Sequence, residues 1–167
     1  THFHGYSMGG RIGFGMLIYE TKRLNSMIIG GMHPYVGMVQ EAVVSRWSNL
    51  LSEGSMQAVV SKIESKSGPM PASHRARFLN NDPKALYASI NAVTDMQEVA
   101  GAITNHRIPS LMYVGEVDEY YEGVRKFSDS TQGCRLVTFP GLGHLQVSRE
   151  SEKVVPHIKS FLAEVTG

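Results

Sequence analysis

A serine between glycines, near the first residue, constrains the fold of this chain more than any other sequence feature. The run GYSMGG occupies residues 5–10, between an extended segment at 1–4 and an apolar, helix-like segment at 11–19. A strand, a sharp turn and a helix form the context of a G-x-S-x-G nucleophile elbow. So tight a turn is expected to leave no room for a Cβ at Gly5 or Gly9, and to push the Ser7 Oγ outward.

Size and composition indicate one globular domain that works without polyanionic partners. The chain has 167 residues, 42% of them hydrophobic, and a net charge of +1. This charge gives no long-range field for nucleic acid, and the pair Arg75 and Arg77 is too small to track phosphates. The apolar runs are far shorter than the ~20 residues of a membrane span. Cys134 is the only cysteine, which excludes internal disulfides and cysteine-based zinc sites and favours a reduced, cytoplasmic setting.

The hydrophobic pattern predicts an α/β chain with a helical insertion. Strand signals occur at 27–31, 108–115 and 135–139, and the extended segment at 1–4 is typical of the end of a strand. Between about 35 and 105 the apolar residues recur only at helical spacing. We therefore expect a parallel sheet of about four strands with helices on both faces. Residues 1–34 and 106–167 are expected to form this core, and 35–105 a separate helical layer.

Prolines indicate where two of the predicted helices begin. Asp82 is followed by Pro83, which is typical of an N-cap and a first helical position. The apolar spacing of the last segment, from Val155 to Val165, predicts a C-terminal helix. Because proline breaks a helix interior, Pro156 is expected in the first turn of this helix.

An acid and a histidine follow two of the predicted strands. The sequence GEVD at 115–118 ends on Asp118, directly after one strand, and PGLGH at 140–144 places His144 after the next. In open parallel sheets the carboxyl ends of the strands meet at one edge, where ligands bind. A serine hydroxyl is a weak nucleophile that needs a base and a group that orients the base. Ser7, Asp118 and His144 supply these groups in that chain order.

With these residues the chain resembles the second half of an α/β-hydrolase fold protein, of the esterase, lipase and carbon–carbon bond hydrolase branch that carries a helical cap. The resemblance implies that Ser7 is the nucleophile, His144 the general base and later acid, and Asp118 the orienting carboxylate. It also implies that the N–H of Met8 is an oxyanion-hole donor. The matching segments are GYSMGG at 5–10, NDP at 81–83, IP at 108–109 with Leu111, GEVD at 115–118 and GH at 143–144.

The sequence departs from this family in two places. About four strands precede the elbow in such proteins, and a loop among them supplies a second oxyanion donor; neither has a counterpart here. We therefore expect the strand at 1–5 to be an open sheet edge that pairs with a missing N-terminal segment or with a second copy of the chain. In addition, no proline follows Asp118, so Glu116 or Glu119 remain alternative orienting acids.

The predicted function is hydrolysis of a small, largely apolar ester-like substrate. Tyr6, Met32, Met38 and Trp47 are the predicted substrate contacts, although the methionines fit a simple core equally well and Trp47 fits cap packing better. The resemblance implies no cofactor and no metal. The pair His2 and His4 is not expected to bind a metal either, because it lacks a third ligand nearby. A non-catalytic ligand-binding module, or an inactive fragment, is the alternative. A neutral histidine base implies activity that falls below pH ~6 to 7.

Overall fold

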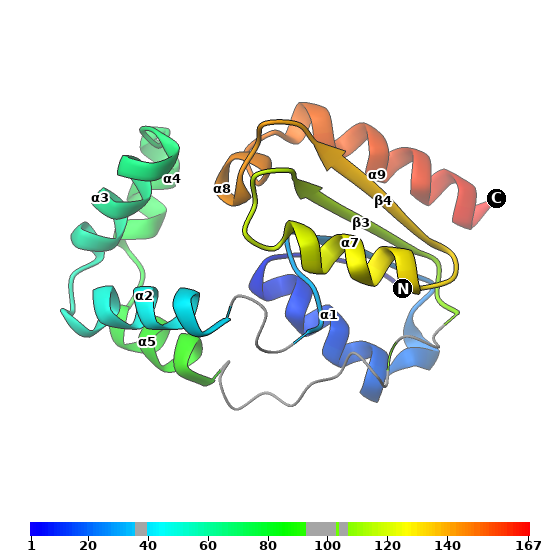
Figure 1. The fold of residues 1–167 in the computed structure, drawn as a ribbon, viewed down its shortest axis with the longest axis horizontal. Coiled ribbons are helices and arrows are strands. Elements are labelled where there is room, and N and C mark those ends of the chain that lie inside the picture. Colours follow the sequence, from blue (N-terminus) through cyan, green and yellow to red (C-terminus); the bar gives the residue numbers. More distant parts are fainter. Residues whose placement is uncertain (36–39, 93–102, 104–106) are drawn as a thin grey trace. The chain divides into compact units, whose positions relative to one another are not determined.

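The computed structural model describes residues 1–35, 40–92, 103 and 107–167, and it divides the chain into two compact units. The first unit comprises Thr1–Tyr35 and Glu98–Gly167, and the second comprises Val36–Gln97. Figure 1 shows the sheet of the first unit and the helices of the second. The predicted end of the helical insertion, at residue 105, lies outside the described residues.

A parallel sheet forms the centre of the first unit. Its strands are β1 (His2–Tyr6), β2 (Ser26–Gly30), β3 (Ser110–Gly115) and β4 (Cys134–Phe139), hydrogen-bonded in this order. Every pair is parallel, and all residues of β2 and β3 are buried. Strands buried on both faces consist of continuous apolar residues, which is the pattern that predicted them. The expected four-stranded parallel sheet is thus confirmed.

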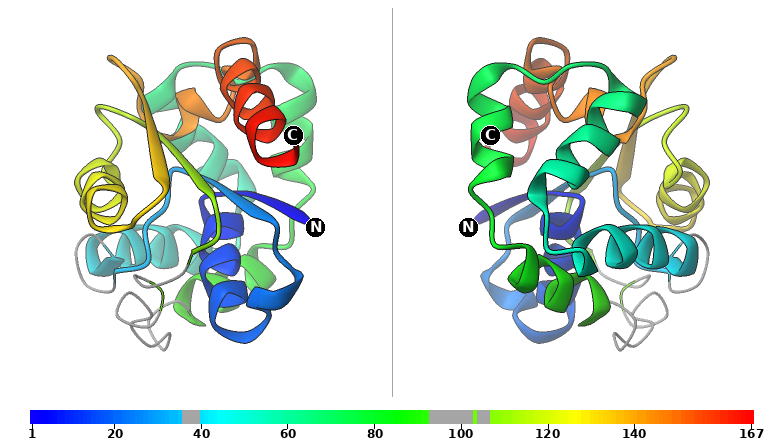
Figure 2. Two further views of the ribbon diagram at one scale, coloured as in Figure 1. Left: turned by 90° about the vertical axis from the view of Figure 1, so that its right-hand side faces the viewer. Right: turned by 90° about the vertical axis from the view of Figure 1, so that its left-hand side faces the viewer.

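Helices cover both faces of this sheet, as Figure 2 shows. On one face lie α1 (Met8–Tyr19) and α7 (Tyr121–Ser130), whose Phe14 and Phe127 rings meet edge to face at 5.2 Å. On the other face α8 (His144–Val147) and α9 (Ser151–Thr166) enclose a core that includes Ile28, Leu111 and Phe161. The short 3-10 helix η1 (Thr21–Arg23) connects α1 to β2. The predicted α/β layering is therefore confirmed.

The C-terminal helix begins earlier than predicted. α9 starts at Ser151, and the N–H of Val154 already bonds the carbonyl of Glu150 at 2.9 Å, so Pro156 lies inside the helix. The expectation of Pro156 in the first turn was wrong. Burial of Val154 against the sheet extends the helix toward its N-terminus, and burial of an apolar residue outweighs one backbone hydrogen bond lost at proline.

The second unit contains only helices among its described residues, as the apolar spacing predicted. They are α2 (Gln40–Ser52), α3 (Met56–Ser67), α4 (Ala72–Leu79) and α5 (Pro83–Ala92). The Asp82 carboxylate accepts a 2.8 Å hydrogen bond from the N–H of Lys84, so the predicted helix start at Pro83 is confirmed. Val59, Val60 and Ile63 of α3 are buried. That this unit acts as a cap stays a prediction.

Among the described strands, β1 lies at one edge of the sheet and pairs with β2 alone. The adjacent helix α1 exposes apolar side chains: Met8 and Ile12 are each 57% exposed and Tyr19 is 82% exposed. An unprotected edge strand is a template for further pairing. Pairing along β1 with another segment or a second copy stays a prediction, which sedimentation analysis tests. Among the described residues, no helix combines the length and apolarity needed to cross a membrane.

Candidate active site

Ser7 lies in the sharp turn between β1 and α1. Its φ of 54° and ψ of −115° make it the one non-glycine residue with positive φ in the described part of the chain. Its N–H donates a 2.8 Å hydrogen bond to the carbonyl of Gly30 at the end of β2. Such strained backbone persists only where surrounding contacts hold it, and it occurs often at active sites. The turn therefore has the backbone conformation that a nucleophile elbow requires.

The glycines around this turn differ in what they make room for. A Cβ on Gly5 would lie 2.4 Å from the carbonyl carbon and oxygen of Gly9, so glycine is required there. A Cβ on Gly9 would meet nothing within 4 Å, whereas one on Gly10 would lie 2.8 Å from Ile29 Cγ2. The expected crowding at Gly9 was wrong, because Gly9 faces away from the sheet and Gly10 faces it.

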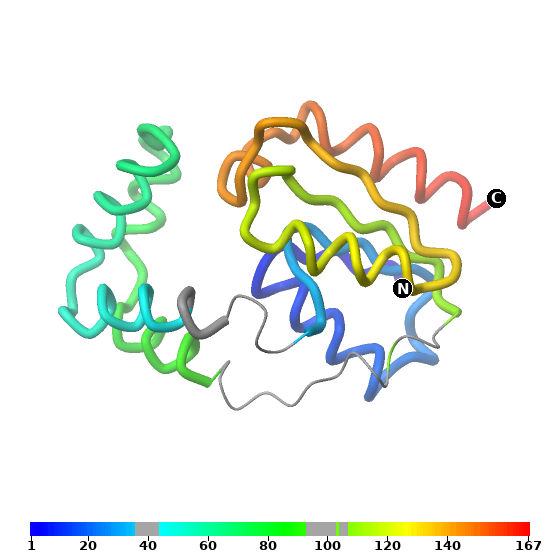
Figure 3. The backbone as a smooth tube through the Cα atoms, viewed as in Figure 1, coloured from blue at the N-terminus to red at the C-terminus, as the bar shows by residue number. Residues whose placement is uncertain are grey.

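Three strand ends bring together the serine, the histidine and the acid. His144 Nε2 lies 2.9 Å from Ser7 Oγ, and His144 Nδ1 lies 2.9 Å from Asp118 Oδ2. Figure 3 traces how the two distant parts of the chain that carry them come side by side in the first unit. Because a carboxylate only accepts, Nδ1 holds the ring proton and Nε2 is free to accept from the serine hydroxyl.

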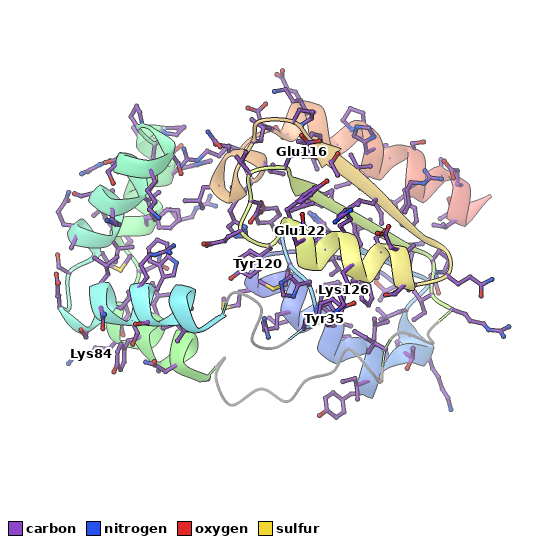
Figure 4. All side chains as sticks on the ribbon, in the orientation of Figure 1. Tyr35, Lys84, Glu116, Tyr120, Glu122 and Lys126 are labelled. Atoms are coloured by element: carbon purple, nitrogen blue, oxygen red, sulfur yellow. The ribbon has the colours of Figure 1, made fainter. Side chains whose placement is uncertain are left out.

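The Asp118 carboxylate is buried and held in place by its own turn. Its Oδ1 accepts a 3.0 Å hydrogen bond from the N–H of Tyr120, and its side chain is 0% exposed. Glu116 is exposed and accepts from the hydroxyl of Thr138 at 3.2 Å, and Glu119 is exposed as well. Figure 4 labels Glu116 beyond the end of β3 and Tyr120 before α7. Asp118 is therefore the acid that contacts His144, and its role as the orienting acid stays a prediction.

Met8 is the first residue of α1, directly after Ser7. The first N–H groups of a helix have no carbonyl partner within the helix, so they can bind a developing negative charge. The Met8 side chain is 57% exposed, so it does not crowd the buried side of the turn. The position of Met8 fits the predicted oxyanion donor, whose role stays a prediction.

Two tyrosine rings flank the imidazole of His144. The ring centroids of Tyr6 and Tyr120 lie 5.2 Å and 5.3 Å from that of His144, and the Tyr6 hydroxyl donates to the His144 main-chain carbonyl. Burial, and next the charge of Asp118, raise the pKa of Tyr6. The contact of Tyr120 was not predicted. The aspartate two residues earlier signals only the hydrogen bond from the Tyr120 N–H, since aspartate side chains often bond the N–H two residues on, and it gives no sign of the ring contact.

The predicted substrate contacts lie in different parts of the molecule. Met32, two residues after β2, is 4% exposed, and its sulfur accepts from the guanidinium of Arg11 at 3.7 Å. Arg11 is itself buried, which lowers its pKa. Trp47 lies on α2 of the second unit and is partly buried, and Met38 lies outside the described residues. Their roles, and that of Tyr6, in substrate binding stay predictions.

In each of the two N-terminal histidines, one ring nitrogen forms a hydrogen bond with a hydroxyl group. His2 Nδ1 lies 2.8 Å from the Ser26 hydroxyl, and His4 Nε2 lies 2.9 Å from the Tyr113 hydroxyl. Within the described residues, no three His, Cys, Asp or Glu side chains gather in a way that could hold a metal ion. The groups that meet at Ser7 are a hydroxyl, an imidazole and a carboxylate.

Solved structures with the same fold are enzymes of several kinds. MenH from S. aureus matches with a TM-score of 0.79 and 19% identity, covering 99% of this chain and 69% of that protein. An enol-lactonase from Burkholderia xenovorans matches with a TM-score of 0.81 and 16% identity, over 98% and 65% of the two chains. A carboxylesterase of the thaumarchaeon Nitrososphaera gargenis matches with a TM-score of 0.82 and 16% identity, covering 99% of this chain and 65% of that protein. The chain thus spans about two thirds of the length of these proteins. The sequence matches no family model and no curated protein.

Proposed function

Because the chain has the α/β-hydrolase fold, we propose that it is a serine hydrolase acting on small, largely apolar carboxylic esters or related acyl compounds. The observation that supports this proposal most is the continuous hydrogen-bond chain from Ser7 Oγ through both nitrogens of His144 to Asp118, with 2.9 Å at each step. A serine activated in this way is suited to acyl transfer.

The proposed reaction first transfers the acyl group to Ser7 and then hydrolyses it, and His144 moves the proton in both steps. The Nε2 of His144 takes the Ser7 proton as Oγ attacks the substrate carbonyl, and the N–H of Met8 donates to the resulting oxyanion. The protonated imidazole then gives its proton to the leaving alcohol, which leaves an acyl group on Ser7. Water, deprotonated by His144, attacks this ester, and the acid leaves as Ser7 regains its proton. Asp118 stays ionised throughout and keeps Nδ1 protonated.

Apolar side chains next to the reacting groups support the proposed substrate class. Met8 follows Ser7 and is 57% exposed, and Val117 precedes Asp118 and is 66% exposed. Exposed apolar side chains around a few polar groups are typical of sites that bind apolar ligands. Met32, which belongs to the same unit as Ser7, is kept among the proposed contacts.

Hydrolysis of short-chain p-nitrophenyl esters tests this function. We expect turnover by the protein, loss of turnover in Ser7→Ala, and full turnover in Ser160→Ala, which removes an exposed serine hydroxyl on α9. An intact fold in each variant is checked by circular dichroism. Ester binding without turnover would contradict the proposal and favour the alternative of a ligand-binding module. Turnover that survives in Ser7→Ala would contradict Ser7 as the nucleophile.

A further inference from the structure

The hydroxyl of Tyr6 connects the serine turn to the histidine loop. It donates a hydrogen bond to the main-chain carbonyl of His144, and Tyr6 directly precedes Ser7 in the chain. The two rings also pack together, with centroids 5.2 Å apart and planes inclined by 44°. Ser7 and His144 are therefore linked by a second connection, which does not involve the hydrogen bond between their own side chains.

Gly30, the last residue of β2, and Gly31, the next residue, leave the space that the Tyr6 ring occupies. A Cβ on Gly30 would lie 2.4 Å from Tyr6 Cδ2, and a Cβ on Gly31 would lie 2.9 Å from Tyr6 Cζ and 3.0 Å from His144 Cε1. Real side chains do not approach so closely, so any larger residue would displace the tyrosine ring or the imidazole. The sequence around β2 thus allows Tyr6 to reach His144.

The loop that carries His144 is held mainly by hydrogen bonds at its neighbours. Within the loop, Gln146 Oε1 accepts from the N–H of Gly143, and the Gly143 carbonyl accepts from the N–H of Gln146 and of Val147. The carbonyl of Leu142, two residues before His144, accepts from the N–H of Val117 at 3.2 Å. Gly141 has a φ of +70°, and α8 has four residues, of which only Val147 is buried. Glycine-rich backbone retains much conformational freedom. The Tyr6 hydroxyl therefore supplies a tie at His144 itself, beyond the one at Leu142.

We propose that Tyr6 is a positioning residue that holds the imidazole of His144 at hydrogen-bonding distance from Ser7, and is not the substrate contact expected from the sequence. The proposal rests on the proposed hydrolase function. A displacement of about 1 Å between reacting groups can cost on the order of 10² in rate, so one hydrogen bond to the base's main chain has a measurable effect. The raised pKa of Tyr6 means that its hydroxyl remains a donor at neutral pH.

Kinetics of Ser7 labelling by a fluorophosphonate probe test this role. We expect Tyr6→Phe, which keeps the ring, to lower the maximal labelling rate about 10-fold, with an unchanged probe concentration for half-maximal rate. Tyr113→Phe is the matched control, because it removes the hydroxyl that contacts His4 from a ring 5.8 Å from that of Tyr6. It should leave both constants unchanged.

Three results would overturn the positioning role. The first is a maximal labelling rate of Tyr6→Phe equal to that of the unsubstituted protein. The second is a raised half-saturating probe concentration with an unchanged maximal rate. The third is a maximal rate that falls only in proportion to the folded fraction measured by circular dichroism. If the unmodified protein does not label at Ser7, the proposed hydrolase function fails instead. The imidazole NMR signals of His144 then decide on Tyr6: Tyr6→Phe should shift or broaden them and Tyr113→Phe should not, and unchanged signals in Tyr6→Phe overturn the proposal.

Discussion

Two histidines follow strands of the same sheet, yet the hydrogen bonds around their rings differ. His33 comes three residues after β2 and His144 five residues after β4, and both rings pack against Tyr120, at 5.6 Å and 5.3 Å. Each nitrogen of His144 has a hydrogen-bond partner. His33 is 0% exposed, and neither of its nitrogens makes a hydrogen bond of good geometry to a described residue.

The comparison teaches that a position at a strand end does not by itself make a histidine a base. Burial, and next the nearby guanidinium of Arg11, lower the pKa of His33 to about 4. Its neutral ring packs between Tyr35 and Tyr120, and a Cβ on Gly123 would lie 1.9 Å from it. His33 thus has the environment of a packing residue, whereas His144 has an acid on one nitrogen and a hydroxyl on the other.

The largest expected difference between the two histidines is the effect on kcat of removing each imidazole ring. We expect His144→Ala to lower kcat for ester hydrolysis on the order of 10⁶-fold, because the base that activates Ser7 is lost. His33→Leu, of similar volume, should change kcat by no more than a few fold. Steady-state kinetics of both variants measure this difference. A loss in His33→Leu as large as in His144→Ala would break the distinction.

The acid on His144 is the feature that His33 lacks. We expect Asp118→Asn to lower kcat on the order of 10⁴-fold, because an amide no longer fixes the tautomer that leaves Nε2 as the acceptor. Glu116→Gln is the matched control, since this exposed carboxylate contacts Thr138 instead of His144. Equal losses in the two variants would contradict the assignment of Asp118.

His33 should affect the pH dependence of stability. Its folded-state pKa of about 4 lies below the value of 6.5 in the unfolded chain, so above pH 6.5 both states are neutral. As the pH falls, the unfolded state binds a proton that buried His33 does not, and up to about 3 kcal/mol of unfolding free energy is lost by pH ~4. The free energy of unfolding, measured by urea denaturation at each pH, should fall less steeply with decreasing pH in His33→Leu than in the unsubstituted protein. An identical pH dependence in the two proteins would show that His33 does not titrate in this way.

The packing around His33 should tolerate no added carbon. Gly123→Ala on α7 should reduce the free energy of unfolding by ~1 to 3 kcal/mol, because the new Cβ overlaps the His33 ring. Gly15→Ala on α1 is the matched helical control. Its Cβ meets nothing within 4 Å, so it should raise stability by about 0.5 to 1 kcal/mol. Denaturation midpoints at neutral pH measure both effects.

Much of the site was predictable because it depends on strand ends. Continuous apolar runs predicted β2 and β3, and a parallel sheet brings the residues after its strands to one edge. Ser7, Asp118 and His144 meet there although 137 residues separate the first from the last. The meeting of these distant sequence positions thus followed from the sheet topology together with the motif around Ser7.

Features that depend on local three-dimensional contacts were not predictable in this way. Asp118 was one of three candidate acids, and the hydrogen bond from the N–H of Tyr120 is what fixes its carboxylate toward His144. Helical spacing alone did not reveal that burial of Val154 would place the start of α9 at Ser151, five residues before Pro156. Nor does the sequence pattern distinguish the crowded Gly10 from the open Gly9.

Peptide mapping after exposure to a fluorophosphonate tests most directly whether His144 activates Ser7. Mass spectrometry of the digested protein should find one phosphonyl adduct, on the peptide that contains Ser7, and His144→Ala should prevent its formation. An unmodified Ser7 in the folded protein, or equal modification of exposed serines such as Ser160, would contradict the account.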